Sequence, residues 1–557
     1  MTNGSQIFQT NSTSRWRGVK WTGRIIFFLA LFVLAVVILA ISLAQNPSAN
    51  VKPGEYHGNK DSMRLSSYHN KKIKGFKNFL EKKEREELLK GQSNKINKAS
   101  GQFIRAAFYT PWSGSKSSPS LERNGDKINM IFPEWFFIDT NNNIRLQTRI
   151  DSAGLSQMRR QHIRIMPMLT NFNSAENKKD FDGSLLHTIL NDTFKQRKFI
   201  QQIIDTLEFY HFQGINVDFE EIKESSNKPL TRFQKNLYNT LHAKNLVVTQ
   251  DVSAMNDDYD YEQLSDYNDY VVLMAYDEYN NSSGPGPICD QKWVEDALDQ
   301  AAKKIDSKKI ILGLAGYGYD WQKETGEDGK TEIKVTDLSY AQAINRAKIS
   351  NAVIDFDNNN YNLHYTYTQK NAETGSPLIT HEVWFTDAST TFNIMRFADE
   401  YGLAGTALWR LGSEDPRTWS FYNRDLDNNA LQKDPFNFNL LSTVPIDPNQ
   451  KPSWVGQEGG EILNILSSPQ EGKIKLEIDN AEQLISEQVY IQLPSGYVYE
   501  KSGEDTTDIG PGHKIILTFD DGPSDEYTPK IIEILEKEKI PATFFIVGIE
   551  AEQNHCD

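Results

Sequence analysis

The feature of this sequence that most constrains its fold is the regular alternation of short apolar runs with amphipathic segments. Eight runs have the composition of buried strands, and segments with helical spacing, such as 293–305 and 391–401, lie between them. Strands and helices that alternate in this way build parallel α/β folds, and eight such strands predict a closed (β/α)8 TIM barrel. The predicted strands are 104–112, 128–138, 163–171, 213–220, 246–254, 270–276, 309–316 and 405–411.

The fourth predicted strand ends in acidic residues. Successive side chains of a strand point to opposite faces, so Asn216, Asp218 and Glu220 share one face, and the apolar residues between them share the other. Carboxylates at positions i and i+2 lie about 6 to 7 Å apart, which is close enough to couple and to flank a sugar bond. Reactive groups of a TIM barrel come from the C-terminal strand ends, where Glu220 falls. The alternation alone also allows acids that cap the next helix or face solvent.

The residues of this strand, Gln-Gly-Ile-Asn-Val-Asp-Phe-Glu, resemble the signature Asp-Gly-x-Asp-x-Asp-x-Glu of glycoside hydrolase family 18. Gly214, Asp218 and Glu220 match the signature, whereas Gln213 and Asn216 depart from it. The resemblance implies that Glu220 is the catalytic acid and Asp218 its partner, in a substrate-assisted reaction where the 2-acetamido oxygen attacks the anomeric carbon. We assign Asn216 to the substrate-binding set, and its amide can donate a hydrogen bond to the Asp218 carboxylate.

Further matches to the same family follow in chain order. Phe-Tyr-Thr-Pro-Trp ends the first strand, Met-Ala-Tyr-Asp ends the sixth, and a Trp ends the eighth. The resemblance implies that Tyr276 and Asp277 contact the acetamido group of the substrate, that Trp409 forms the floor under the reacting sugar, and that Tyr109 also binds substrate. A Tyr or Trp in a strand, taken alone, is more often a core residue. The third-strand ending at 167–171 resembles the branch of spore-cortex and other cell-wall hydrolases.

A second signature lies near the C-terminal end of the sequence. Lys-Ile-Ile-Leu-Thr-Phe-Asp-Asp-Gly-Pro at 514–523 resembles the start of a NodB-type polysaccharide deacetylase of carbohydrate esterase family 4. The resemblance implies that Asp520 is a general base and that Asp521 binds a divalent metal such as Zn²⁺ together with two His of a His-x-x-x-His motif. His555 has the wrong spacing for that motif. A catalytic Zn²⁺ normally needs three protein ligands, so we expect a deacetylase fragment with no bound metal and no activity.

The N-terminal part predicts a membrane anchor. Residues 25–44 form an apolar run in which Ser42 is the only polar residue, and about 20 such residues span a hydrocarbon core. Basic residues precede the run, which places the N-terminus in the cytoplasm. We therefore expect an uncleaved, single-pass anchor in the cell membrane with the catalytic part outside the cytoplasm. A cleaved signal peptide is the alternative.

Composition divides the rest of the chain. We predict a cytoplasmic tail at 1–24, a charged stalk at 45–100, the barrel at 101–433 with an inserted β-rich lobe at about 322–379, a linker at 434–460, a small β module at 461–508 and the deacetylase fragment at 509–557. The fragment suggests a piece of a longer multi-enzyme protein. The net charge of −15 does not favour a nucleic-acid partner.

These observations predict an extracytoplasmic, membrane-anchored glycosidase that cleaves polysaccharides containing β-linked N-acetylglucosamine, with no cofactor for the hydrolase. Two alternatives stay open. The barrel could bind the glycan without cleaving it, or it could trim a chain made by the same polypeptide as a processing module of exopolysaccharide synthesis. The presence of Glu220 favours the enzyme over the idle barrel, because the non-catalytic barrels of the family usually lack this acid.

Overall fold

The structure is a computed structural model that describes residues 103–553, apart from 113–114, 139–145, 174–179, 223–227, 326–330, 371–377, 448–449, 458–459, 480–482 and 503–516. The predicted tail, anchor and stalk lie outside the described residues. Among the residues that are described, no helix combines the length and the apolar composition that a membrane crossing requires.

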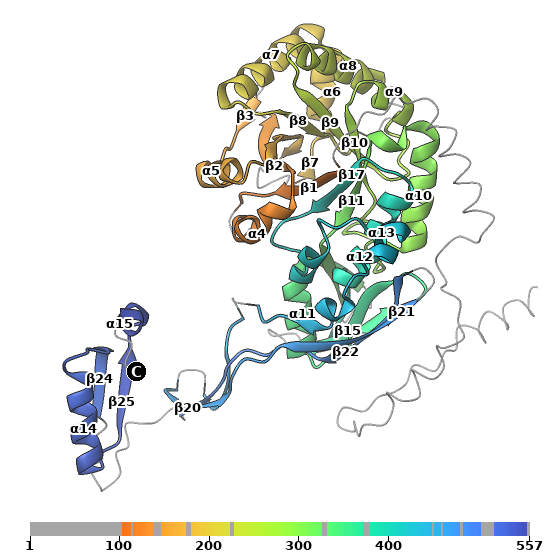
Figure 1. Cartoon of the computed structure of the whole chain (residues 1–557). Helices are drawn as coiled ribbons and strands as arrows, with labels where there is room; N and C mark the ends of the chain where they lie inside the picture. The colour runs from red at the N-terminus through yellow and green to blue at the C-terminus, as the bar shows by residue number, and fades with distance from the viewer. Residues whose placement is uncertain are drawn as a thin grey trace, which may run out of the picture. The chain divides into compact units, whose positions relative to one another are not determined.

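Within the described residues, eight parallel strands close into a barrel (Figure 1). Their order is β1-β17-β11-β10-β9-β8-β5-β2, and β2 pairs again with β1. Each predicted strand segment holds one of these barrel strands, so the predicted TIM barrel is confirmed. The strands are β1 (Ile104–Tyr109), β2 (Met130–Ile138), β5 (Met168–Thr170), β8 (Gly214–Asp218), β9 (Val247–Ser253), β10 (Tyr270–Met274), β11 (Ile310–Ala315) and β17 (Gly405–Trp409).

Helices surround the barrel strands (Figure 1). Many begin directly after an Asp whose side chain accepts backbone N–H groups of the first turn, which stabilises a helix N-terminus. At α7, for example, Asp192 accepts from the amides of Phe194 and Lys195, each at 3.0 Å. The helices are α4 (Ser117–Asn124), α5 (Ser152–Arg160), α6 (Gly183–Asn191), α7 (Thr193–Tyr210), α8 (Lys228–His242), α9 (Tyr261–Asp266), α10 (Gln291–Lys304) and α12 (Ala388–Glu400).

The barrel has two apolar layers because strand side chains alternate between its two faces. One layer fills the interior and includes Phe108, Phe132, Met168 and Val272. The other layer packs the strands against the helices. Polar residues that follow the inner-layer residues by two positions, at the C-terminal strand ends, point to the same side. They therefore project into the barrel mouth. Gly214 starts β8 where a Cβ atom would lie 2.1 Å from the carbonyl oxygen of Val247, so only glycine fits there.

The predicted lobe is present between β11 and α12. Five antiparallel strands form its sheet, in the order β13-β12-β16-β15-β14, and one helix covers it. The lobe starts at Tyr317, earlier than predicted, because β12 continues almost directly from the barrel strand β11. Its elements are β12 (Tyr317–Thr325), β13 (Thr331–Ser339), α11 (Tyr340–Ile349), β14 (Asp355–Asp357), β15 (Asn362–Lys370) and β16 (Leu378–Phe385).

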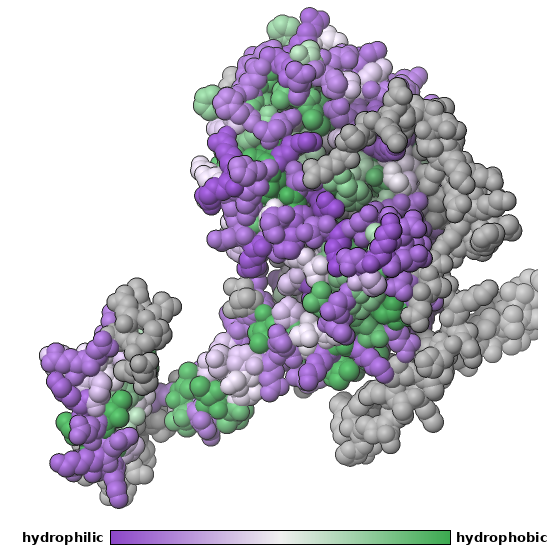
Figure 2. Space-filling model, in the orientation of Figure 1, coloured by the Kyte–Doolittle hydropathy of each residue, from purple (hydrophilic) through white to green (hydrophobic). Residues whose placement is uncertain are grey.

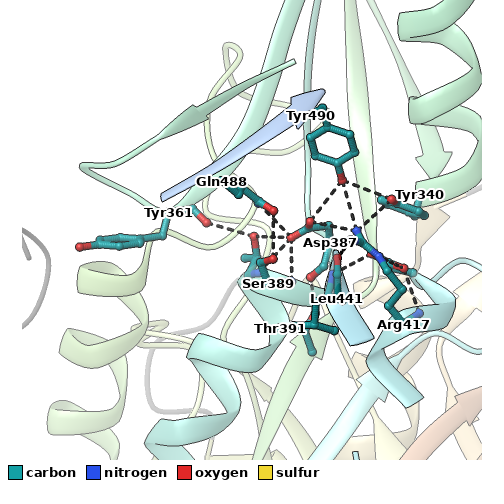
Figure 3. A network of polar contacts seen from close by, with 12 residues as sticks. Tyr340, Tyr361, Asp387, Ser389, Thr391, Arg417, Leu441, Gln488 and Tyr490 are labelled. Atoms are coloured by element: carbon teal, nitrogen blue, oxygen red, sulfur yellow. Dashed lines mark hydrogen bonds and ion pairs between the residues drawn. The ribbon is translucent and has the colours of Figure 1, made fainter. Parts of the chain in front are cut away.

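The strands β21 (Gly472–Asp479) and β22 (Leu484–Gln492) form a hairpin that packs on the start of α12 through a buried polar network (Figure 3). Arg417 binds Asp415 at 2.6 Å and Asp387 at 3.2 Å. From β22, Tyr490 donates a hydrogen bond to Asp387 at 3.2 Å, and the amide of Gln488 donates to the same carboxylate at 3.3 Å. This hairpin therefore shares a buried interface with the barrel, whereas the predicted boundary at 461 stays a prediction.

The other elements beyond the barrel include a three-stranded sheet of β19 (Ser453–Val455), β23 (Val498–Lys501) and β20 (Ile462–Ser467). Exposed apolar side chains gather on it, and Figure 2 shows them in green. The deacetylase-like segment follows as β24 (Leu517–Gly522), α14 (Thr528–Glu538), β25 (Ala542–Ile546) and α15 (Gly548–Gln553), and β24 pairs with β25 in parallel.

Candidate active site

The C-terminal end of β8 is held by side chains from neighbouring segments. Asn171, which follows β5, accepts the backbone N–H of Glu220 at 2.9 Å and donates its side-chain amide to the Glu220 carbonyl at 2.9 Å. The Tyr259 hydroxyl donates to the carbonyl of Phe219 at 2.7 Å. The residue after Glu220 adopts a positive φ of 53°, so the chain turns away sharply. These contacts fix the backbone that carries Glu220.

Asp218 and Glu220 lie together in the barrel mouth, as the spacing predicted. Burial raises the pKa of Asp218 to about 7, while hydrogen bonds from Thr170 and Glu220 oppose the increase. Burial, followed by the negative charges of Asp218, Asp277 and Asp251, raises the pKa of Glu220 well above its ordinary value. A carboxyl group that keeps its proton near neutral pH is a competent general acid, and its ionised neighbour is a competent anion.

Asn216 is fully buried beneath these acids and contacts a neighbouring strand. Its side-chain amide donates to Asp251 on β9 at 2.7 Å, and its carbonyl oxygen accepts from the Thr249 hydroxyl at 2.6 Å. The sequence allowed this amide to donate to Asp218, whereas in the structure it donates to Asp251. The cause is the parallel register, which places Asn216 beside Thr249. The assignment of Asn216 to substrate binding has no support from this geometry, because the side chain has no exposed surface.

Asp251 was not identified from the sequence. It is 1% exposed, and its Oδ1 atom has no hydrogen-bond partner among the described residues. Burial, followed by the charge of Asp218, raises its pKa. The alternation of β9 puts Thr249, Asp251 and Ser253 on one face, and this pattern could have indicated an inward-facing acid.

Asp277 is held by two tyrosines of the lobe. The hydroxyl groups of Tyr317 and Tyr319 donate to Asp277 Oδ1 at 2.5 and 2.9 Å. Tyr276 is 8% exposed and packs edge-on against Tyr317, with the ring centroids 6.1 Å apart. The charges of Asp277, Glu220 and Asp218 act on the Tyr276 hydroxyl, which places it in the same electrostatic environment. The lobe therefore completes the site by fixing Asp277.

Trp409 ends β17 at the top of the inner apolar layer. Its ring meets the Phe108 ring edge-on at 5.1 Å, and the residue keeps part of its surface exposed. An aromatic ring that rests on a packed core and has an accessible side can support a sugar ring by stacking.

Tyr109 does not join this site. Its hydroxyl donates to Asp151 Oδ2 at 2.5 Å, just before α5, and its ring packs against Trp135 in the layer between strands and helices. Tyr109 follows the inward-facing Phe108, so the strand alternation turns its side chain outward. The assignment of Tyr109 to substrate binding is therefore not supported by its position.

Two charged residues of the mouth were not anticipated. Glu134 on β2 is 7% exposed, and its Oε2 atom has no hydrogen-bond partner among the described residues. Burial and the charge of Asp218 raise its pKa to about 8, while Arg410 opposes the increase. Arg410 donates to the Thr110 hydroxyl at 3.3 Å, and its guanidinium group lies 4.9 Å from the ring centroid of Trp112.

Asp520 and Asp521 are exposed near the end of β24. The described residues hold no group of three or more His, Cys, Asp or Glu side chains arranged to bind a metal ion. The expectation that the deacetylase-like segment binds no metal stays a prediction.

A TIM barrel whose mouth holds two neighbouring, buried carboxyl groups on one strand end fits the class of the glycosidases. The sequence supports this class directly, since residues 104–415 match the family described as Glycosyl hydrolases family 18. The match covers more than half of the chain, so the protein belongs to glycosyl hydrolase family 18. Residues 508–556 match part of the family described as Polysaccharide deacetylase.

Relatives agree with this assignment, and a solved structure shares the fold. The chain is 26% identical to Uncharacterized glycosylase YvbX of Bacillus subtilis (strain 168), over 54% of this chain and 85% of that protein. It is 27% identical to the Cortical fragment-lytic enzyme of Bacillus anthracis, over 46% of this chain and only 58% of that protein. The crystal structure of the Bacillus cereus spore cortex-lytic enzyme SleL shares the fold, with a TM-score of 0.50, 23% identity and coverage of 58% and 75%.

Proposed function

We propose that this protein cleaves polysaccharides that contain β-linked N-acetylglucosamine by substrate-assisted, retaining catalysis. The observation that carries the proposal is the pair Asp218 and Glu220, two coupled carboxyl groups at one strand end, next to Tyr276 and Asp277. The Cortical fragment-lytic enzyme of Bacillus anthracis and Uncharacterized glycosylase YvbX of Bacillus subtilis (strain 168) among the relatives support a lytic glycosylase activity.

In the proposed reaction, Glu220 donates its proton to the glycosidic oxygen and later removes a proton from the attacking water. Asp218 accepts a hydrogen bond from the acetamido N–H of the substrate and stabilises the positive charge of the oxazolinium intermediate. Tyr276 donates to the acetamido oxygen, and Trp409 stacks on the sugar ring. Asn171 acts only through the backbone of Glu220.

The same proposal includes the predicted location. The apolar run at 25–44 and the basic residues before it support a single-pass anchor with the barrel outside the cytoplasm. This location is tested by introducing cysteines on the barrel surface and treating intact cells with a membrane-impermeant thiol reagent. We expect the introduced cysteines to be labelled. Labelling of these cysteines only after cell lysis would contradict the predicted location.

The function is tested by incubating the full chain, and its Glu220→Gln variant, with defined N-acetylglucosamine oligomers. We expect cleavage by the wild type with retention of the β-anomer in the first product, and loss of cleavage in the variant. Binding of the oligomers without cleavage by either protein would favour the alternative of a barrel that only holds the glycan.

A further inference from the structure

Glu134 is a buried charged residue that the proposed reaction does not use. It lies on β2 two residues after Phe132, whose ring belongs to the inner apolar layer, so the strand alternation directs Glu134 into the barrel as well. Its Oε2 atom is buried and has no hydrogen-bond partner within the part of the chain that the structure describes. A buried carboxyl oxygen without a partner is unfavourable, and at the mouth of the barrel a ligand can supply that partner.

The charges around Glu134 favour a cationic ligand. Five carboxyl groups gather in the mouth, whereas the acid and anion of the proposed reaction account for only two of them. They are Glu134, Asp218, Glu220, Asp251 and Asp277. Two cations, Arg410 and Arg149, partly offset this negative charge at Glu134, and Arg149 lies over the Phe137 ring. The guanidinium group of Arg410 faces Trp112 and Thr110.

The partners of these carboxyl groups separate Glu134 from Asp277, and only in part from Asp251, whose Oδ1 atom also lacks a hydrogen-bond partner among the described residues. Asp277 already accepts two tyrosine hydroxyl groups, and Asp251 accepts the amide of Asn216. Burial, followed by the charge of Asp218, raises the pKa of Glu134, and a cation placed beside it would favour its ionised form.

We propose that Glu134 is a specificity-determining residue that binds the ammonium group of a glucosamine unit next to the reacting sugar. The substrate would then be a partially de-N-acetylated polymer, in which the reacting sugar keeps its acetamido group and a neighbouring sugar carries a free amine. This inference rests on the proposed function, because it places a sugar chain in the same mouth. The match of residues 508–556 to a polysaccharide deacetylase family is consistent with such a polymer, since deacetylation produces free amines.

The test compares two oligomers of equal length, one fully acetylated and one with a single free amine. We expect the wild-type chain to have a kcat/KM roughly tenfold higher for the amine-containing oligomer, which corresponds to one charge-assisted hydrogen bond. In Glu134→Gln this preference disappears through an increase in KM, while kcat/KM for the acetylated oligomer stays within about threefold of wild type. Asp399→Asn, at a half-buried carboxyl group on α12, is the matched control and keeps the preference.

Two results would overturn the proposal. One is an equal loss on both oligomers in Glu134→Gln, which indicates a structural role or contact with a hydroxyl group. The other is a wild-type chain without preference for the amine, whatever the variant does. Calorimetric binding of both oligomers to the Glu220→Gln chain, with and without Glu134→Gln, decides the same question without turnover. If the wild type cleaves neither oligomer, the proposed function fails, but this binding measurement still tests Glu134.

Discussion

Strands β8 and β24 both carry acids at or near their C-terminal ends, and the structure gives these acids different surroundings. At β8, Asp218 is 4% exposed, and the strand lies between β5 and β9. At β24, Asp520 and Asp521 are exposed, and β25 is the strand that pairs with β24 among the described residues. The acids of β8 have strongly raised pKa values because protein surrounds them. The comparison teaches that the neighbours of a carboxyl group, more than its place in a motif, decide which chemistry it can perform.

The largest effect should come from removing the acid of β8. Glu220→Gln is expected to reduce kcat/KM on N-acetylglucosamine oligomers by roughly 10³-fold or more, because the side-chain amide is not acidic enough to protonate the glycosidic oxygen. Steady-state turnover measures the loss. Asp520→Asn, the corresponding change on β24, is the control and should leave turnover unchanged. Equal losses of kcat/KM in both variants would contradict the idea that the buried acid of β8 and the exposed acid of β24 differ in function.

Asp218→Asn should reduce kcat by roughly 10²-fold, because the amide cannot stabilise positive charge as a carboxylate does. It should also change the pH profile. The charge of Asp218 raises the pKa of Glu220, so its removal lowers that pKa. Activity depends on protonated Glu220, so the alkaline limb of the kcat/KM profile should move to lower pH. A profile with an unmoved alkaline limb would show that the two groups are not coupled.

Asn171→Ala tests whether the fixed backbone of β8 matters. The change removes two hydrogen bonds to Glu220, each worth about 1 kcal/mol, so we expect a roughly tenfold decrease in kcat. KM should change less, since Asn171 acts through Glu220. Asn171→Asp keeps the oxygen that accepts the backbone N–H of Glu220. Its kcat should therefore lie between that of Asn171→Ala and that of the wild type. Full activity in Asn171→Ala would contradict the positioning role.

Asp251→Asn should increase the stability of the fold relative to the wild type, and this increase should be larger at higher pH. The pKa of Asp251 is raised in the folded state, so folding retains a proton that the unfolded chain releases, and stability is lost as pH rises toward the folded pKa. Asparagine does not ionise, so the variant avoids this loss. Each kcal/mol added to the free energy of unfolding raises Tm by roughly 2 °C for a domain of this size. Thermal unfolding at pH 5 and pH 8 should show a variant advantage that grows with pH. A constant difference would contradict it.

The smallest effect is expected at β24. Asp520→Asn and Asp521→Asn together should change the free energy of unfolding by less than about 0.5 kcal/mol, because both side chains are exposed and asparagine accepts the positive φ of 62° at position 521 as aspartate does. Thermal unfolding of the double variant measures this. A larger change would show that these acids have partners in the folded chain.

The sequence determined the barrel and the identity of the acid pair. Strand alternation, helical spacing and eight repeats fix a parallel barrel because each apolar face needs a partner, and the i, i+2 spacing alone puts Asp218 and Glu220 on one side. The family signature added roles for these residues. Nothing in the local pattern could show that Asn171, far from Glu220 in the chain, holds the backbone of Glu220.

Only the tertiary structure decided which other residues belong to the mouth. Tyr109 was excluded because its neighbour Phe108 occupies the interior, and Asn216 was directed to Asp251 by the register between β8 and β9. Glu134 and Asp251 entered the mouth from strands whose sequences carry no signature. The physical reason is that burial and charge coupling depend on distances between strands remote in sequence, and closure of the barrel sets those distances.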